Sequence, residues 1–216
     1  PTVGNVLRSM WERGWSFIKK AGTIILLSTI FVWFTSRFGW LDGQFCMLEE
    51  EQISASILAK IGNAIAWIFA PLGWGNWQAA VASITGLVAK ENIVATLGTL
   101  YSGGAGTVYD AIAAAFTGIT GYSFLVFNLL CAPCFAAIGA IKREMNSPKW
   151  TWFAIGYQCG FAYAVALMIN QFGGLFTGNA NIIGVIAAVI VLAAIIYMLV
   201  RPYKEATKLT GDVKVK

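Results

Sequence analysis

The sequence predicts an all-α fold, a polytopic integral membrane helical bundle in which some helices are broken or re-entrant. Of the 216 residues, 58% are hydrophobic and only 12% are charged, whereas about a quarter of the residues in a soluble domain are charged. No charged residue lies between Lys149 and Arg201, a stretch long enough for two membrane-spanning helices. Prolines and glycines interrupt two other apolar stretches, which predicts breaks within helices.

The N-terminal part predicts a basic lead-in followed by a first membrane helix. Residues 1–20 are expected in the cytoplasm because basic residues favour that side of a membrane. Their basic residues include Arg8, Arg13, Lys19 and Lys20. The apolar run 21–36 predicts a helix that runs outward, and the acidic stretch 37–60 predicts an external loop with a short interfacial helix. The chain starts without methionine or a secretory leader, so we expect no signal peptide and expect a piece of a longer protein.

Two segments with unusual features follow. The run 61–70 is too short to cross a membrane alone and is followed by Pro71, Gly73 and Gly75, so it predicts a re-entrant hairpin, although a crossing stays open. Residues 78–100 are long enough to cross as one helix.

Three polar residues, Lys90, Glu91 and Asn92, stand in the middle of that second segment. Such residues are costly in lipid and are expected to face the bundle interior or water. Glu91 is a candidate cation ligand or proton carrier, while Lys90 and Asn92 are candidate gating residues. The alternative is an ion pair with another helix, or a Lys90 side chain that extends to the interface.

Residues 122–141 predict a spanning helix with a proline inside it. Pro133 has no N–H to bond the carbonyl of Leu129, so the helix is expected to kink or open there, with Pro133 as a third gating candidate. In lipid the freed carbonyl needs a partner, which could be water, a neighbouring helix or an ion. Cys131 and Cys134 would share one face of that helix, within a turn of the break.

The last third predicts two more crossings. The short basic loop 142–149 is expected in the cytoplasm, the helix 150–172 runs outward, and the helix 182–200 returns to a cytoplasmic basic tail, 201–216. Both ends then lie in the cytoplasm, which requires an even number of crossings. Whether 107–120 crosses is left open.

The composition excludes several classes of protein. The chain has no histidine, so it cannot by itself build a Ser-His-Asp triad or a His-ligated zinc site, and we do not expect an enzyme. It also lacks a phosphate-binding G-x-x-x-x-G-K-[ST] motif. The basic residues gather at the edges of apolar runs, which favours membrane lipid as a partner and not nucleic acid.

Three cysteines are candidate metal ligands. Thiolates of Cys131 and Cys134 suit Fe(II), Zn(II) or Cu(I), and two ligands make the weak site that a transport path requires. Cys159, next to Gln158, adds a third thiol if its helix meets the broken one. The alternative is that these cysteines are small apolar packing residues, or that the C-x-x-C is a redox pair. Cys46 receives no role.

Three segments carry a family resemblance: GLVAKENIVATLG at 86–98, CAPCFAAIGAIKRE at 131–144 and YQCGFAYAVAL at 157–167. Together they resemble the last gate region of the ferrous iron transport protein B (FeoB) family. The resemblance implies an inner-membrane Fe(II) transporter of bacteria or archaea, with residues 21–200 as a gate region and Fe(II) as the transported ion. It also implies partners outside this chain: a GTPase domain, through which alone GTP would act, and an earlier gate region. A homo-oligomer is left open.

Two other function classes remain from the sequence. Similar broken-helix gates occur in transporters of nucleosides and other small solutes, but the mid-membrane polar side chains Asn92, Gln158 and Asn170 are few for a solute site. A non-transporting membrane assembly module is the third class. It predicts that removing Cys131 and Cys134 leaves metal uptake unchanged.

Overall fold

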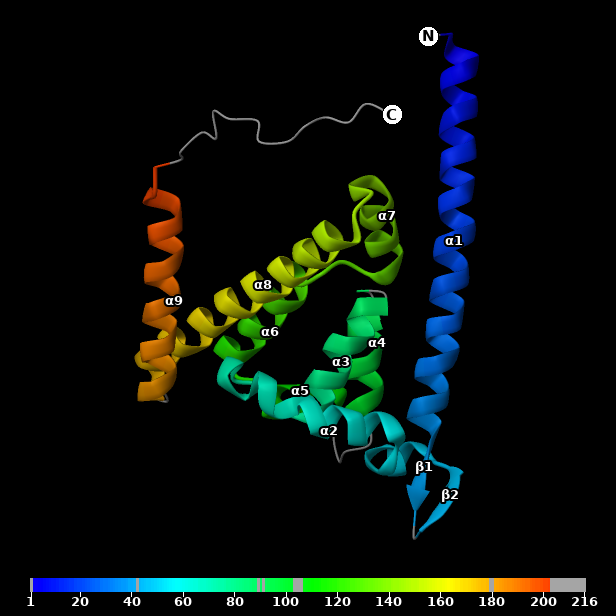
Figure 1. Ribbon diagram of the computed structural model, residues 1–216. Helices are drawn as coiled ribbons and strands as arrows, with labels where there is room; N and C mark the ends of the chain where they lie inside the picture. The colour runs from blue at the N-terminus through cyan, green and yellow to red at the C-terminus, as the bar shows by residue number, and fades with distance from the viewer. Residues whose placement is uncertain are drawn as a thin grey trace.

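The computed structural model describes residues 2–41, 43–88, 90, 92–102, 107–178 and 181–202, and it confirms the all-α membrane class (Figure 1). The elements in chain order are α1 (Val3–Arg37), β1 (Phe38–Leu41), β2 (Gln44–Met47), η1 (Glu50–Ala55), α2 (Ile57–Phe69), η2 (Ala70–Leu72), α3 (Trp77–Val88), α4 (Asn92–Leu100), α5 (Val108–Ala115), α6 (Gly118–Leu130), α7 (Phe135–Met145), α8 (Pro148–Thr177) and α9 (Ile182–Val200).

Within the described ranges, α8 and α9 are the two helices long and apolar enough to cross a membrane. Two bent helix pairs raise the number of spans to as many as four if each pair counts as one. The pair α2–α3 bends by 97° and the pair α5–α6 by 94°. The prediction of broken or re-entrant helices is therefore confirmed, and α1 as a crossing stays a prediction.

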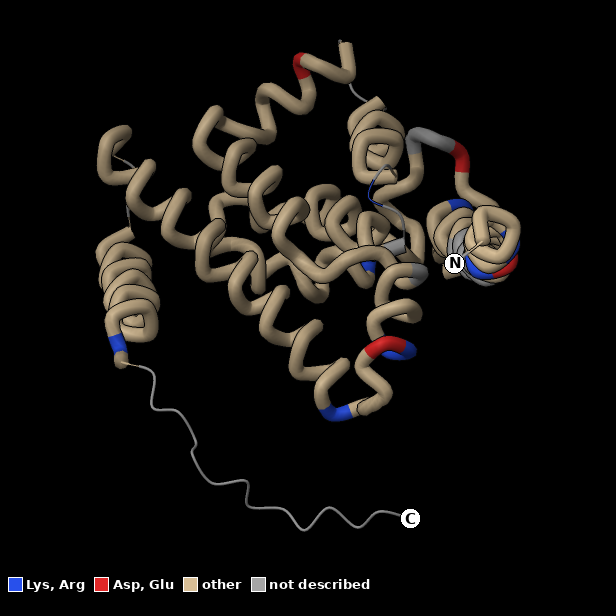
Figure 2. Tube along the Cα trace, turned by 90° about the horizontal axis from the view of Figure 1, so that it is seen from above, with Lys and Arg blue, Asp and Glu red and all other residues tan. Residues whose placement is uncertain are grey.

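The ends of the elements separate into two sets along the long axis of the molecule. In Figure 1 the N-terminal end of α1, α7 and the C-terminal end of α9 lie toward the top, whereas the β-hairpin, the C-terminal end of α8 and the N-terminal end of α9 lie lower down. Figure 2 shows that the charged segments lie mostly at helix ends and at the periphery. This arrangement matches the pattern of a protein whose apolar middle faces lipid.

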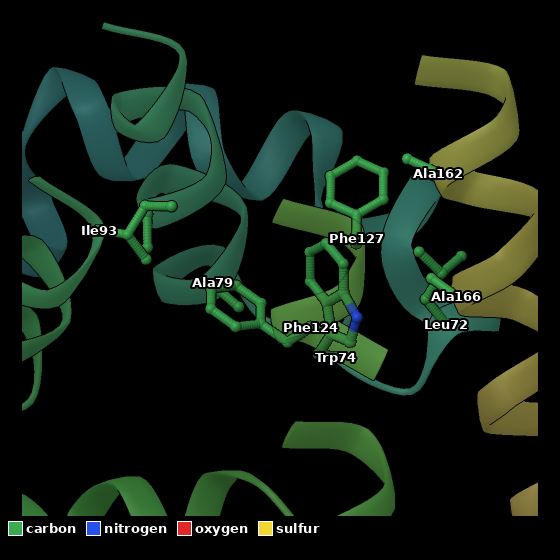
Figure 3. Close-up of a cluster of buried hydrophobic side chains, with 9 residues drawn as sticks. Leu72, Trp74, Ala79, Ile93, Phe124, Phe127, Ala162 and Ala166 are labelled. Carbon is green, nitrogen blue, oxygen red and sulfur yellow. The ribbon is translucent and has the colours of Figure 1, made fainter. Parts of the chain in front are cut away.

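The core is an aromatic cluster where α3, α6 and α8 meet (Figure 3). Trp74 is 1% exposed, and its ring stacks on Phe69 with 4.5 Å between ring centroids. The rings of Phe124 and Phe127 from α6 contact Trp74 at centroid distances of 5.1 and 5.3 Å. Small residues of α8, Ala162 and Ala166, allow that helix to approach the rings closely.

The 37–60 region contains a β-hairpin that the sequence analysis does not predict. Phe38 pairs with Met47, and Gly43 takes φ +82° at the turn. The dipeptide Asp42-Gly43 is a common two-residue hairpin signal and could have indicated it. The ammonium of Lys60 lies 4.6 Å from the ring centroid of Trp40, which ties the hairpin to α2.

The prediction of one crossing helix over 78–100 is wrong. The segment forms two helices that pack side by side, since the hydroxyls of Thr85 on α3 and Thr96 on α4 lie 3.1 Å apart and Gly86 packs against Ile93. Lys90 lies in the turn between them. The turn places the ammonium of Lys90 next to the C-terminal end of α6.

Candidate ion-path site

The helix predicted over 122–141 opens at Pro133. Helix α6 ends at Leu130 and α7 begins at Phe135, with Cys131 and Cys134 in extended backbone conformations between them. The open form of the predicted break is thus confirmed. The carbonyl of Leu129 loses the partner that residue 133 would supply in a continuous helix.

Lys90 supplies the missing partner. Its Nζ donates to the carbonyl oxygen of Leu129 at 3.0 Å and to that of Cys131 at 3.3 Å. A cation is favourable here because the C-terminal end of a helix carries partial negative charge. The break between α3 and α4 therefore meets the break between α6 and α7 through one ammonium group.

The thiol pair at this site is not the one that the sequence spacing suggests. The Sγ atoms of Cys131 and Cys159 lie 3.6 Å apart, and both side chains are half-buried. Cys134 is the residue before α7, and its side chain makes no capping hydrogen bond. The helix of Cys159 does meet the broken helix, as the third-thiol hypothesis requires.

Other predicted site residues have different positions. Asn92 begins α4 and is partly exposed, without a polar contact to Cys131 in the part of the chain that the structure describes. Glu91 lies outside the described residues. Gln158 keeps a buried Oε1 atom for which the described residues offer no hydrogen-bond partner, so α8 carries an unused oxygen ligand next to Cys159 in the chain.

The arrangement can hold a cation only weakly. Over the described ranges, no group of three or more His, Cys, Asp or Glu side chains could hold a metal ion. Instead, Cys131 contributes to both a pair of sulfur atoms, with Cys159, and a pair of backbone oxygens, with Leu129, and the ammonium of Lys90 already bonds to the oxygens. Weak ligation allows an ion to enter and leave again, as passage through a membrane requires.

A second proline break, between α2 and α3, is held by uncharged groups. Gln171 Nε2 and Asn170 Nδ2 on α8 donate to the carbonyl of Pro71 at 2.7 and 3.1 Å. The hydroxyl of Tyr163 donates to Ile68 at 2.8 Å, and that of Ser123, which is fully buried, lies 3.0 Å from the carbonyl of Leu72. These partners of the break cannot be predicted from the local sequence pattern, because 51 to 100 residues separate them from the carbonyls that they bond.

A cavity of about 1010 Å³ adjoins this second break. It lies between the break, the N-terminal ends of α6 and α9, and the second half of α8. Among the described residues none that lines it is charged, and amides, hydroxyls and apolar groups share its wall. Its polar side chains are those of Thr117, Thr120, Tyr163, Asn170, Gln171, Thr177 and Asn181.

Broken helices that meet in an apolar bundle define a membrane protein of the gate type. The family model Gate, described as nucleoside recognition, matches residues 18–148, and the chain belongs to this family. The chain is also 39% identical over 177 residues to the Fe(2+) transporter FeoB of Methanocaldococcus jannaschii, covering 81% of this chain and 26% of that protein.

Further relatives carry the same name. The Fe(2+) transporter FeoB of Staphylococcus aureus strain COL is 34% identical over 82% of this chain, and that of Campylobacter jejuni is 32% identical over 74%. The resemblance to FeoB is thereby confirmed. The chain spans about a quarter of the length of these curated relatives. No solved structure matches it significantly.

Proposed function

We propose that this chain forms part of the permeation path and gate of an Fe(II) transporter. The observation that carries the proposal is the ammonium of Lys90 on the carbonyl oxygens of Leu129 and Cys131, beside the thiols of Cys131 and Cys159. An ammonium at a pair of backbone oxygens occupies the position that a passing metal cation would use. The relatives named above are Fe(2+) transporters, which supports Fe(II) as the cargo.

The gate works by exchange of one cation for another. With Lys90 on the carbonyls, the path is closed both by its side chain and by its positive charge, which repels a metal ion. When α3 and α4 move the ammonium away, the two oxygens and the two sulfurs become ligands for Fe(II). Thiolate sulfur and carbonyl oxygen together suit a borderline metal such as Fe(II).

The same proposal includes the orientation of the chain in the membrane and the domains that would control it. The basic ends near α7, α1 and α9 gather at one end of the molecule (Figure 1), which supports a cytoplasmic side for both chain ends in the inner membrane of a bacterium or archaeon. A GTPase domain and an earlier gate region would lie in the remaining three quarters of a longer polypeptide. GTP would act through that domain, by moving α3 and α4.

The cavity next to Pro71 favours a second candidate function, transport of a neutral polar solute. The family description, nucleoside recognition, agrees with a wall of amides and hydroxyls. Titration of the purified protein with nucleosides checks this candidate. Saturable binding that Gln171→Ala abolishes would favour it over Fe(II) permeation.

The main test is Fe(II) flux into liposomes that contain the complete transporter, under anaerobic conditions. Cys131→Ala and Cys159→Ala each remove one sulfur and should lower the flux by about tenfold or more, as the loss of about 1.4 kcal/mol of ion stabilisation would. Cys46→Ala, which alters the cysteine on the β-hairpin, is the matched control and should leave the flux unchanged. Wild-type flux in both site variants, at equal protein level, would exclude the thiol path.

A further inference from the structure

Besides ligating an ion, two thiols at this distance can react with each other. Cys131 Sγ and Cys159 Sγ are 3.6 Å apart, and a disulfide bond of about 2 Å needs them to approach by roughly half that separation. Cys131 lies in the non-helical break, where no continuous helix fixes its backbone. The break can therefore supply the movement, while Cys159 stays in the middle of α8.

We propose that Cys131 and Cys159 form a reversible disulfide that closes the gate under oxidising conditions. This inference rests on the proposed function for its effect on Fe(II) passage, but not for the bond itself. The pairing differs from a redox C-x-x-C, because Cys134 lies before α7 and Cys131 contacts α8 instead.

The oxidant is hydrogen peroxide. One thiol loses its proton and its sulfur attacks a peroxide oxygen, so that the O–O bond breaks, the sulfenic acid forms and the departing hydroxide takes up the proton as water. The second thiol then attacks the sulfenic sulfur, so that the S–S bond forms, the S–O bond breaks and a second water leaves. The two sulfur atoms lose two electrons in total, the peroxide oxygens gain them, and both thiol protons leave in the waters.

The disulfide would act on the gate in two ways. It ties the break at Cys131 to α8, so the ends of α6 and α7 can no longer move apart from that helix. It also removes both sulfur atoms as ligands for Fe(II). Because Fe(II) and peroxide together produce damaging radicals, a path that closes when peroxide is present prevents further import at that moment.

The test uses the complete transporter in liposomes, oxidised with hydrogen peroxide and freed of peroxide before Fe(II) is added anaerobically. Peptide mapping by mass spectrometry should find the peptide of Cys131 linked to that of Cys159. Fe(II) flux should fall by about tenfold or more, and dithiothreitol should restore it. Cys46→Ala should behave like the wild type in both measurements.

Any of three results would overturn the proposal: a Cys131–Cys134 link after oxidation, no link at all, or the expected link with unchanged flux. The mapping needs no variant, so a folding defect in a cysteine mutant does not affect it. A reduced protein that carries no Fe(II) would instead contradict the proposed function, and the peptide map would still decide the pairing.

Discussion

At the two proline breaks of this molecule, different chemical groups bond the carbonyls that the breaks leave without a helical partner. At Pro71 the carbonyls of the break are bonded by amide and hydroxyl groups of α8 and α6, and two of these partners, Ser123 and Gln171, are buried. At Pro133 the freed carbonyl is bonded by one long, charged side chain from the turn between α3 and α4. At both breaks, carbonyls that would be costly to leave unpaired in lipid have found a donor.

The number of donors at each break bears on how easily its conformation could change. The neutral side chains around Pro71, which come from α6 and α8, must all move together before the break between α2 and α3 can change its conformation. These contacts therefore hold α2, α3 and α8 in one arrangement. At Pro133, by contrast, one ammonium bonds both carbonyls, so the proposed exchange for another cation requires only that one side chain to leave. We therefore propose a structural role for the first break, in keeping with the gating role proposed above for the second.

The largest stability effect should come from Gly73→Ala at the fixed break. Gly73 has φ +90°, and a Cβ there would collide with the Asn170 side chain. Backbone strain and steric overlap together should lower the free energy of unfolding by about 2–4 kcal/mol. Denaturation in mixed detergent micelles measures it. Gly98→Ala is the control, because a Cβ at Gly98 meets no atom within 4 Å; equal losses in both variants would remove the case for a rigid break.

A smaller stability loss, together with a functional change, should follow from Lys90→Met at the gating break. The variant leaves two carbonyls without their charged donor, at a cost of about 1.5–3 kcal/mol to the closed form. The open population, and with it nucleotide-independent Fe(II) leak, should rise by about tenfold or more.

The leak is measured in liposomes without GTP, beside two controls. Lys90→Arg keeps the charge and should stay close to the wild type, whereas Lys60→Met changes a lysine whose ammonium lies over the hairpin ring of Trp40 and should produce no leak. If the Lys90→Met protein leaks no more Fe(II) than the wild type, the ammonium is not the gate.

The smallest effect should come from Ser123→Ala. It removes the hydroxyl near the carbonyl of Leu72 and should cost about 1–3 kcal/mol of unfolding free energy, with no leak. Thr99→Ala removes a hydroxyl that donates to the carbonyl of Ala95 in its own helix and should cost less. Denaturation and liposome flux measured on the same samples check both. A leak in Ser123→Ala would mean that the first break also gates.

The sequence predicts the need for these contacts but not the partners. Proline chemistry alone indicates that the carbonyl of Leu129 needs a donor, and charge alone marks Lys90 as a gating candidate. Nothing in the sequence pattern shows that the two meet, because 39 residues separate them and the contact depends on the turn between α3 and α4.

The contact between Cys131 and Cys159 could not be singled out from the sequence for a related reason. The spacing of Cys131 and Cys134 places them on one face only if the helix is continuous, and Pro133 removes that condition. Once the helix opens, Cys131 is free to contact α8, and the sequence analysis offers Cys159 only as an additional thiol. The prediction of the two apolar helices α8 and α9 needs only the composition of the chain, and it is correct.

The most direct test of the account is the reaction of each cysteine with a water-soluble maleimide in the complete transporter, with and without Fe(II), under anaerobic conditions. We predict that Fe(II) slows the labelling of Cys131 and Cys159 and leaves that of Cys46 on the hairpin unchanged. Equal labelling of Cys131 and Cys159 in both conditions, while Fe(II) still crosses the membrane, would contradict the account and make these thiols packing residues.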